Sequence, residues 1–233
     1  MADGCECWTD DIWKAIHIFT LTSSLKENEE KASVCTLLIS LNKIISCPTI
    51  EREVFSFMEQ SDNDVMKYMS SNKLLFSWSH RLREHVCSVL EKKCPSLSDL
   101  TAYFNPAMLT KDVWGPILWR LMHTVLLRAK LIDGFCPEPI QQAVKAFVTC
   151  FAISLPCPKC RSHAWEYYSS HDIDSYLLTN LYMFEWSVLF HNAVTMRINE
   201  EHGYKRKIYK PIEALQFYVN VPEGVDFNSR FKN

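Results

Sequence analysis

Residues 155–168 read LPCPKCRSHAWEYY and set two cysteines three positions apart at the start of a predicted helix. Pro158 suits the first helical position, which places Cys157 at the N-cap and Cys160 in the first turn. Free amide groups and the helix dipole stabilise a thiolate there, and the basic side chains that follow add positive charge. The stretch favours redox chemistry over a passive structural disulfide.

A zinc site is the alternative interpretation of the same stretch, because Cys157, Cys160 and His163 supply three ligands. Structural zinc usually needs a second paired half, and no cysteine follows position 160. His171 or His191 would have to complete the site from a distance. We therefore favour the redox interpretation and expect no metal.

The bulk composition is that of a soluble globular protein. The net charge of −2 gives no general attraction to nucleic acid or to anionic membranes. No segment reaches the roughly 18 apolar residues of a membrane span, and the start, MADGCECWTDDIW, lacks the basic region of a signal peptide. We expect an intracellular protein that is not secreted through a signal peptide, has no membrane span and binds no nucleic acid.

The numbers of cysteines and glycines indicate the structural class of the protein. The chain has 10 cysteines, which in a reducing compartment more often serve redox or metal chemistry than static disulfides. It has only 5 glycines and neither G-x-G-x-x-G nor a phosphate-binding P-loop. These observations predict a mostly helical protein in which side chains hold any nucleotide.

The pattern along the chain predicts two helical domains, at residues 1–105 and 106–233. Apolar residues at helical spacing fill the first hundred residues, with long stripes at 11–45 and a helix over 64–92 that breaks near 70–72. Turn-forming residues and two prolines mark the boundary, and no internal repeat is apparent. The second set of helices is expected at 112–131, 138–154, 158–169 and 173–199, the last with a possible interruption at 179–180, followed by an irregular tail.

The segment WGPILWRLMH at 114–123 places Gly115, Trp119 and His123 on one helical face. A gap, a wide indole and an imidazole in file suit a flat ring lying against the helix. The alternative is that Trp119 is a core residue and His123 a hydrogen-bonded core histidine.

The segment FEWSVLFHNAVT at 184–195 sets polar groups on a strongly apolar helix. His191 and Thr195 share a face, and Asn192 is adjacent. Buried polar atoms need partners, which a ligand with ring nitrogens, hydroxyls or phosphates could supply. Taken singly, His191 and Asn192 could equally have structural roles.

Together the three segments resemble the FAD-dependent sulfhydryl oxidases of the Erv/ALR family. The matching motifs are W-G-P-x-x-W-x-x-x-H at 114–123, C-x-x-C at 157–160 and W-x-x-x-x-H-N-x-V at 186–194, in the order the family has them. The resemblance covers residues 110–200, and it is closest to the versions carried by large DNA viruses. It implies an all-α bundle that holds FAD, preceded by a second helical domain for packing, dimerisation or shuttle cysteines.

The resemblance also implies roles for individual residues. Cys160 would be the sulfur next to the flavin, and Cys157 the sulfur that exchanges with incoming dithiols. Thr195 departs from the family pattern, which usually has asparagine at this contact position. Basic residues at 205–207 would offset the pyrophosphate charge together with Arg197. The predicted cofactor-binding residues are Gly115, Trp119, His123, His191, Asn192, Val194, Thr195 and Arg197.

The implied activity is a thiol oxidase that makes disulfides and passes electrons to O2, giving H2O2. The implied partners are a dithiol protein substrate or a thioredoxin-like relay protein, with the enzyme itself a homodimer. Cys5 and Cys7 are the candidate shuttle pair, and Cys87 with Cys94 is the rival pair. A viral origin would place the protein in the host cytoplasm or nucleus and in the virion. The competing functions are a non-catalytic helical scaffold and a zinc-binding interaction module.

Overall fold

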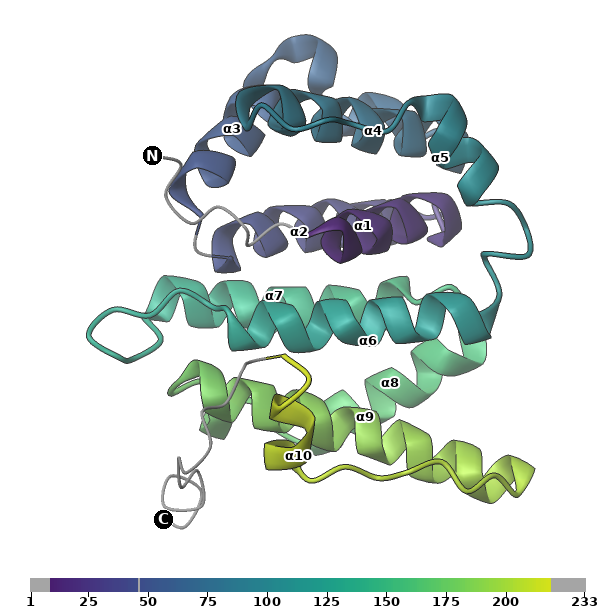
Figure 1. Cartoon of the computed structure of the whole chain (residues 1–233), viewed down its shortest axis with the longest axis vertical. Helices are drawn as coiled ribbons and strands as arrows, with labels where there is room; N and C mark the ends of the chain where they lie inside the picture. Colours follow the sequence, from purple (N-terminus) through teal and green to yellow (C-terminus); the bar gives the residue numbers. More distant parts are fainter. Residues whose placement is uncertain (1–8, 46, 219–233) are drawn as a thin grey trace.

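The computed structural model describes residues 9–45 and 47–218, and within these ranges every regular element is helical. Only isolated β-bridges occur, one of them between Ile45 and Ala129. Figure 1 shows the helices stacked in layers along the long axis of the molecule. The predicted all-α fold class is confirmed. None of the helices in the described ranges has the length and apolar character that crossing a bilayer requires.

The N-terminal bundle comprises the first five helices, at one end of the stack (Figure 1). Two 3₁₀ turns, η1 (Ser61–Asn63) and η2 (Val65–Tyr68), precede its fourth helix. The helices are α1 (Asp10–Thr22), α2 (Asn28–Ile44), α3 (Pro48–Glu59), α4 (Asn72–Val89) and α5 (Leu97–Tyr103).

The C-terminal bundle comprises the next five helices and reaches residue 215. A further 3₁₀ turn, η3 (Asp174–Tyr176), precedes its long fourth helix. The helices are α6 (Lys111–Leu127), α7 (Glu138–Ser154), α8 (Pro158–Ser170), α9 (Asn180–His202) and α10 (Pro211–Leu215). The tail predicted to be irregular thus contains one short helix.

The two bundles pack face to face through their first two helices. The contact between α2 and α7 is the most extensive between any two elements, and α1 lies along α6 (Figure 1). Phe19 meets Phe151 edge to face with ring centroids 5.7 Å apart. Ser23 Oγ donates to the Ser154 carbonyl at 3.5 Å. One continuous hydrophobic core therefore runs through both bundles.

The chain contains an internal repeat, which corrects the prediction that it has none. Residues 64–79 read DVMKYMSSNKLLFSWS and residues 172–187 read DIDSYLLTNLYMFEWS. Asp, Tyr, Asn, Phe, Trp and Ser occupy the same places in both. The segments are 108 positions apart, and each comprises a 3₁₀ turn and the start of the fourth helix of its bundle.

Hydrogen bonds repeat along with the sequence. His17 Nδ1 lies 3.0 Å from Ser79 Oγ, and His123 Nδ1 lies 2.8 Å from Ser187 Oγ. Both serines donate to the carbonyl three residues earlier. The two tryptophans of the repeat also agree, since each indole N–H donates to a backbone carbonyl in the loop before the helix. Helices α1 to α4 therefore correspond to α6 to α9.

The repeat differs where chemistry is expected. Cys47 and Cys157 are both N-cap residues followed by proline, at the starts of α3 and α8. Ile50 stands where the C-terminal bundle has Cys160. Only the C-terminal bundle thus carries a C-x-x-C pair.

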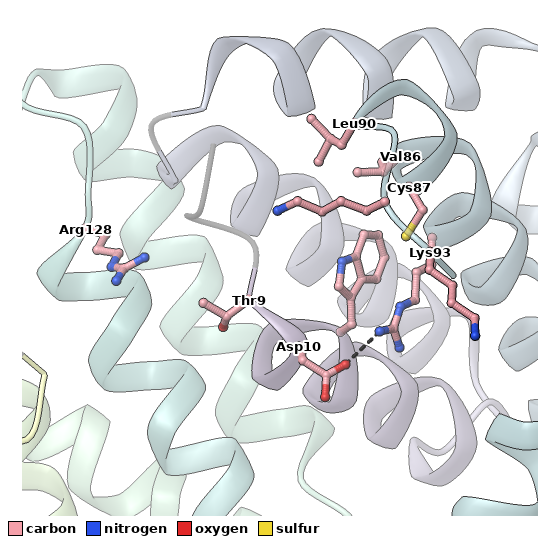
Figure 2. A pocket seen from close by; sticks show the side chains of 10 residues that line it. Thr9, Asp10, Val86, Cys87, Leu90, Lys93 and Arg128 are labelled. Carbon is pink, nitrogen blue, oxygen red and sulfur yellow. Dashed lines mark hydrogen bonds and ion pairs between the residues drawn. The ribbon is translucent and has the colours of Figure 1, made fainter. Parts of the chain in front are cut away.

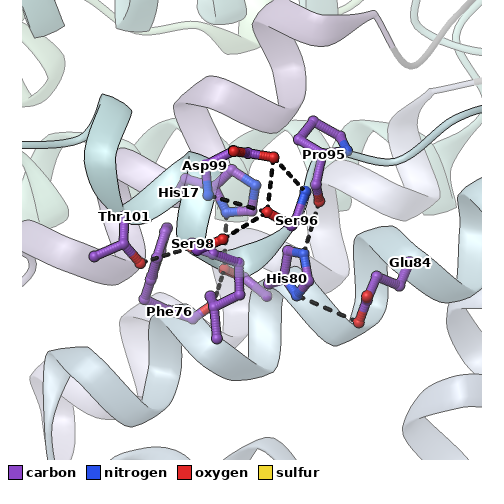
Figure 3. A network of polar contacts seen from close by, with 11 residues as sticks. His17, Phe76, His80, Glu84, Pro95, Ser96, Ser98, Asp99 and Thr101 are labelled. Atoms are coloured by element: carbon purple, nitrogen blue, oxygen red, sulfur yellow. Dashed lines mark hydrogen bonds and ion pairs between the residues drawn. The ribbon is translucent and has the colours of Figure 1, made fainter.

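The connection between α4 and α5 turns the chain back onto α4. His80 Nε2 lies 2.9 Å from the Pro95 carbonyl. Ser96 caps α5 by accepting from the Asp99 amide, while the Asp99 carboxylate accepts from the Ser96 amide (Figure 3). This capping box starts a helix inside the stretch that the sequence indicated as a domain boundary.

Candidate functional site

The C-x-x-C pair lies at the first turn of α8, as predicted. Cys157 is the N-cap residue, Pro158 holds the first helical position, and the Cys160 amide donates to Cys157 Sγ at 3.1 Å. The two cysteines are joined by a disulfide with their Cα atoms 5.1 Å apart. Both are only partly buried, so a thiol from solvent can reach the pair.

Two ion pairs hold α8 against α9. Lys159 Nζ lies 2.8 Å from a Glu201 carboxylate oxygen, and Arg197 Nη2 lies 3.0 Å from one of Glu166. The predicted cofactor residue Arg197 is therefore tied to the helix that carries the disulfide. Because these pairs partly neutralise the local charge, the positive field predicted around the disulfide is weaker than the sequence alone indicates.

The two remaining motifs meet beside this helix pair. Trp119 on α6 stacks on His191 of α9, with ring centroids 4.3 Å apart and an interplanar angle of 8°. Phe190 packs edge to face against the same indole, with ring centroids 5.0 Å apart. The structure thus brings together two predicted residues that lie more than 70 positions apart in sequence.

A chain of hydrogen bonds fixes how His191 presents its ring. Ser187 Oγ donates to the Phe184 carbonyl at 2.6 Å, so it accepts from Nδ1 of His123. His123 Nε2 then carries a lone pair and accepts from His191 Nδ1, 3.1 Å away. His191 is left with an unprotonated Nε2, which is a hydrogen-bond acceptor for a ligand.

Burial keeps both imidazoles neutral. Desolvation, and then the neighbouring His191, lowers the pKa of His123 to about 3. Desolvation lowers the pKa of His191 to about 4. Neither ring carries charge at neutral pH, so the site offers a ligand a neutral acceptor instead of a cation.

Gly115 borders open space on the side where other residues carry a side chain. A methyl group placed on Gly115 would meet no atom within 4 Å, so the backbone borders open space. Val194 and Thr195 lie partly exposed on α9, one turn beyond His191. Gly115 was predicted to let another group approach the helix closely, and the open space agrees with that requirement.

Asn192 has a structural contact that the sequence did not indicate. Its Nδ2 donates to the Tyr209 carbonyl at 2.7 Å, and its Oδ1 accepts from the Tyr209 amide at 3.3 Å. The side chain therefore pins the segment after α9 back onto that helix. Both amide groups are already occupied, so a direct contact with a cofactor would compete with this pairing.

The basic cluster at 205–207 is paired with acidic residues. Arg206 lies 3.9 Å from Asp112 on α6, and Lys207 lies 3.7 Å from Glu213 on α10. Lys207 also lies 4.6 Å from the centre of the Tyr209 ring. Arg206 and Lys207 thus each lie near an acidic residue of the C-terminal bundle.

Comparison with known proteins gives a family match and several viral relatives. Residues 116–212 match the Erv1 / Alr family. The FAD-linked sulfhydryl oxidase of African swine fever virus, isolate Warthog/Namibia, is 30% identical over 43% of this chain and 87% of its own length. The chain belongs to the Erv1 / Alr family. The same oxidase from a Malawi tick isolate is 32% identical, over 38% of this chain and 70% of its length.

A protein of Invertebrate iridescent virus 3 is 28% identical, over 42% of this chain and 64% of its own length. No solved structure matches the chain. The family match begins at residue 116, so it covers the C-terminal bundle. The similarity of the N-terminal bundle to the C-terminal one is shown by the internal repeat and not by the family match.

Of the cysteines outside the C-x-x-C pair, Cys35, Cys136 and Cys150 are free thiols. Cys5 and Cys7, the predicted shuttle pair of this Erv1 / Alr protein, lie outside the described residues. Cys47 is disulfide-bonded. Cys87 and Cys94, the rival pair, have thiols in hydrogen-bond contact. Among the residues described, no three histidine, cysteine or acidic side chains gather as a metal site would require.

Ser187 is the site residue that sequence reasoning missed. It sets the tautomer of His123 and, through it, that of His191. The available signal was a serine in an apolar helix one turn before His191, at the same place as Ser79 in the repeat. The role of Ser187 can be recognised only when α6 is known to lie beside α9, because its partner His123 is on α6.

Proposed function

We propose that this chain is an FAD-linked thiol oxidase that forms disulfides in dithiol substrates and passes the electrons to O2, giving H2O2. The observation that carries the proposal is the disulfide at the N-terminus of α8, clamped to the helix that carries the neutral acceptor His191. Family membership supports the same conclusion.

The residues around Gly115, Trp119 and His191 fit a flavin nucleotide. Open space beside the Gly115 backbone, an indole and a neutral ring nitrogen suit a flat heteroaromatic group. Gly115, Trp119, Val194 and Thr195 would line it, His123 would hold His191 in its acceptor form, and Arg197 with Asn192 would position the surrounding segments. When bound, FAD would supply a two-electron acceptor that O2 reoxidises.

The protein's own sulfurs perform the exchange. A substrate thiolate attacks Cys157 Sγ, which forms a mixed disulfide as the Cys157–Cys160 bond breaks and Cys160 leaves as a thiolate. The second substrate thiol then attacks the mixed disulfide, so the substrate disulfide forms and Cys157 is released. The amide of Cys160, 3.1 Å from Cys157 Sγ, stabilises Cys157 as the leaving thiolate.

The finer features of the proposal concern assembly and partners. The substrate is a dithiol protein or a thioredoxin-like relay protein. Residues 1–105 and 106–233 are two domains, of which the second is catalytic. A homodimer would need a face other than that of α6 and α7, because α1 and α2 cover it. The proposed setting is the interior of an infected cell, with incorporation into virions.

The test combines a visible spectrum with oxygen uptake on dithiothreitol. The purified protein should be yellow, with flavin absorption and dithiol-dependent oxygen consumption. Cys160→Ser should stay yellow and lose at least about a hundredfold in turnover, because no internal disulfide can form. The matched control Cys35→Ser, in the N-terminal bundle, should keep both properties.

Two results would overturn the proposal. One is a colourless protein that does not take up FAD, which would favour a scaffold, or a zinc module if metal analysis found stoichiometric zinc. The other is a Cys160→Ser variant with full oxidase activity.

A further inference from the structure

A cavity of about 380 Å³ opens between α1, the end of α4 and the end of α6 (Figure 2). Trp13, Val86 and Leu90 form its apolar wall. Its volume lies at the small end of the roughly 300–1,000 Å³ range of small-molecule sites. The cavity lies in the N-terminal bundle, which carries no C-x-x-C pair.

The internal repeat places this cavity where the C-terminal bundle has its candidate cofactor site. Trp13 and His17 have the spacing of Trp119 and His123, and each histidine bonds its serine in the same way. On α4, the repeat aligns Arg83 with His191 and Val86 with Val194. The cavity is thus a second copy of a predicted ligand site, with altered side chains.

The alterations make the cavity cationic. Arg83 replaces the neutral His191, and its guanidinium lies 5.9 Å from the centre of the Trp13 ring. Lys92 and Lys93, which follow the end of α4, also line the cavity. The carboxylate of Asp10 pairs with Arg83 at 2.7 Å and is the one acidic side chain among the described lining residues, so the net charge of the lining is positive.

A buried donor at the cavity lacks a partner. Arg83 is 6% exposed, its Nη2 donates to Asp10, and its Nε is buried without a hydrogen-bond partner. An orphaned charged donor in such a place is costly unless a ligand or water accepts from it. The lining therefore suits a ligand that has a negatively charged hydrogen-bond acceptor next to an apolar group.

We propose that this cavity binds a mononucleotide, with its phosphates on Lys92, Lys93 and Arg83 and its base against Trp13, Val86 and Leu90. The volume of about 380 Å³ suits a mononucleotide better than a dinucleotide of the size of FAD. Ile50 replaces the second redox cysteine, so a ligand here takes no electrons from a C-x-x-C pair. The site serves binding, and the thiol oxidase site in the C-terminal bundle is separate from it.

The test is isothermal titration of the FAD-loaded full chain with ADP, with inorganic pyrophosphate and with adenosine. FAD loading fills the oxidase site, so heat from ADP reports the other cavity. We expect ADP to bind at micromolar to submillimolar concentration, and pyrophosphate and adenosine to bind at least tenfold more weakly. The double variant Lys92→Gln/Lys93→Gln should weaken ADP binding at least tenfold without changing FAD content or oxidase turnover.

The charge-matched control is Lys26→Gln/Lys73→Gln, which removes two exposed lysines far from the cavity, one of them at the opposite end of α4. It should bind ADP like the unmodified chain. The proposal is overturned if ADP gives no heat up to millimolar concentration, if both double variants bind ADP equally, or if pyrophosphate alone binds as tightly as ADP.

Discussion

At the scale of single residues, buried neutral histidines are the most consequential side chains. His17 and His123 occupy equivalent places in the two bundles, and each donates from Nδ1 to a buried serine. Desolvation is the largest cause that lowers the pKa of each to about 3. Protonating either ring is therefore unfavourable in the folded protein but not in the unfolded chain.

We predict that stability falls as the pH drops below about 6.5. In that range the unfolded chain binds a proton at His17, whereas the folded chain does not until about pH 3. The free energy of unfolding should thus decrease by about 1.4 kcal/mol per pH unit for this residue alone, and its contribution should be constant above pH 6.5. Urea unfolding at a series of pH values measures this slope.

The variant His17→Asn isolates the effect. Its Nδ2 can still donate to Ser79 but does not titrate, so the slope between pH 6.5 and 4.5 should be shallower by about 1.4 kcal/mol per unit. The exposed His202→Asn is the control and should leave the slope unchanged. Equal slopes in all three proteins would show that His17 is not the titrating group.

Residue-scale predictions from sequence succeeded where they depended on local geometry. Cys157 at an N-cap before Pro158 follows from helix-start rules that act within one turn. The occupation of Asn192 by the Tyr209 backbone could not be foreseen, because it depends on the chain returning 17 residues later. Spacing within one helix does not reveal which neighbour lies against it.

At the scale of elements, the end of α4 is held in an unusual turn. Glu91 has a positive φ of 52°, and the Lys92 amide donates to the Cys87 carbonyl at 2.9 Å. The chain then runs back along α4, fixed by His80 on the Pro95 carbonyl. This return brings the Cys94 thiol to that of Cys87, and burial together with that contact raises the pKa of Cys94 to about 12.

We predict that Cys87 and Cys94 form a disulfide in the air-equilibrated, FAD-loaded protein. Their two thiols would be oxidised by exchange with the Cys157–Cys160 disulfide of another molecule, which becomes a dithiol and is reoxidised by the proposed catalysis. Blocking free thiols, digesting with trypsin and weighing the fragments should reveal the peptide of residues 84–92 linked to one that begins at Cys94.

The matched controls are two single variants. Cys87→Ser should leave Cys94 open to alkylation, while Cys150→Ser, in the buried face of α7, should leave the linked peptide intact. Complete alkylation of both cysteines in the unmodified, active protein would contradict this prediction.

Element boundaries show how far sequence patterns reach. The bounds of α7 agree with the predicted 138–154, because a strong apolar stripe is framed by a proline and a turn. The predicted helix over 64–92 divides at the expected break near 70–72 into a 3₁₀ turn and the shorter α4, with Ser71 as the N-cap. The capping box of α5 was present in the sequence as Ser96 and Asp99, but turn-forming residues around it hid the helix.

At the scale of the whole molecule, the arrangement of the bundles could not be predicted. The helical class follows from glycine scarcity and apolar spacing, and the family motifs indicated the C-terminal bundle. The repeat is weak in the sequence because its shared residues are few and the C-x-x-C pair occurs once. The equivalence becomes clear from the hydrogen bonds of His17 and His123, which join helices far apart in the chain.

We predict that residues 106–233, produced alone, self-associate. Removing the N-terminal bundle uncovers the side of α7 that α2 covers, where residues such as Val144, Phe147 and Phe151 are buried. An exposed apolar face of that size favours a second copy or aggregation. Light scattering after size exclusion, compared with the full chain at the same concentration, measures the result. A monomeric fragment that binds no hydrophobic dye would contradict the prediction.

The packing of α2 on α7 within one polypeptide has a consequence for robustness. A face covered by a separate subunit becomes exposed on dilution, because the subunit dissociates. A face covered by a helix of the same chain stays covered at any concentration. Because only one of the two halves bears the sulfur pair, the other is released from the demands of turnover. Its sequence is then free to acquire a task of its own, at the cost of one catalytic centre for every two folded halves.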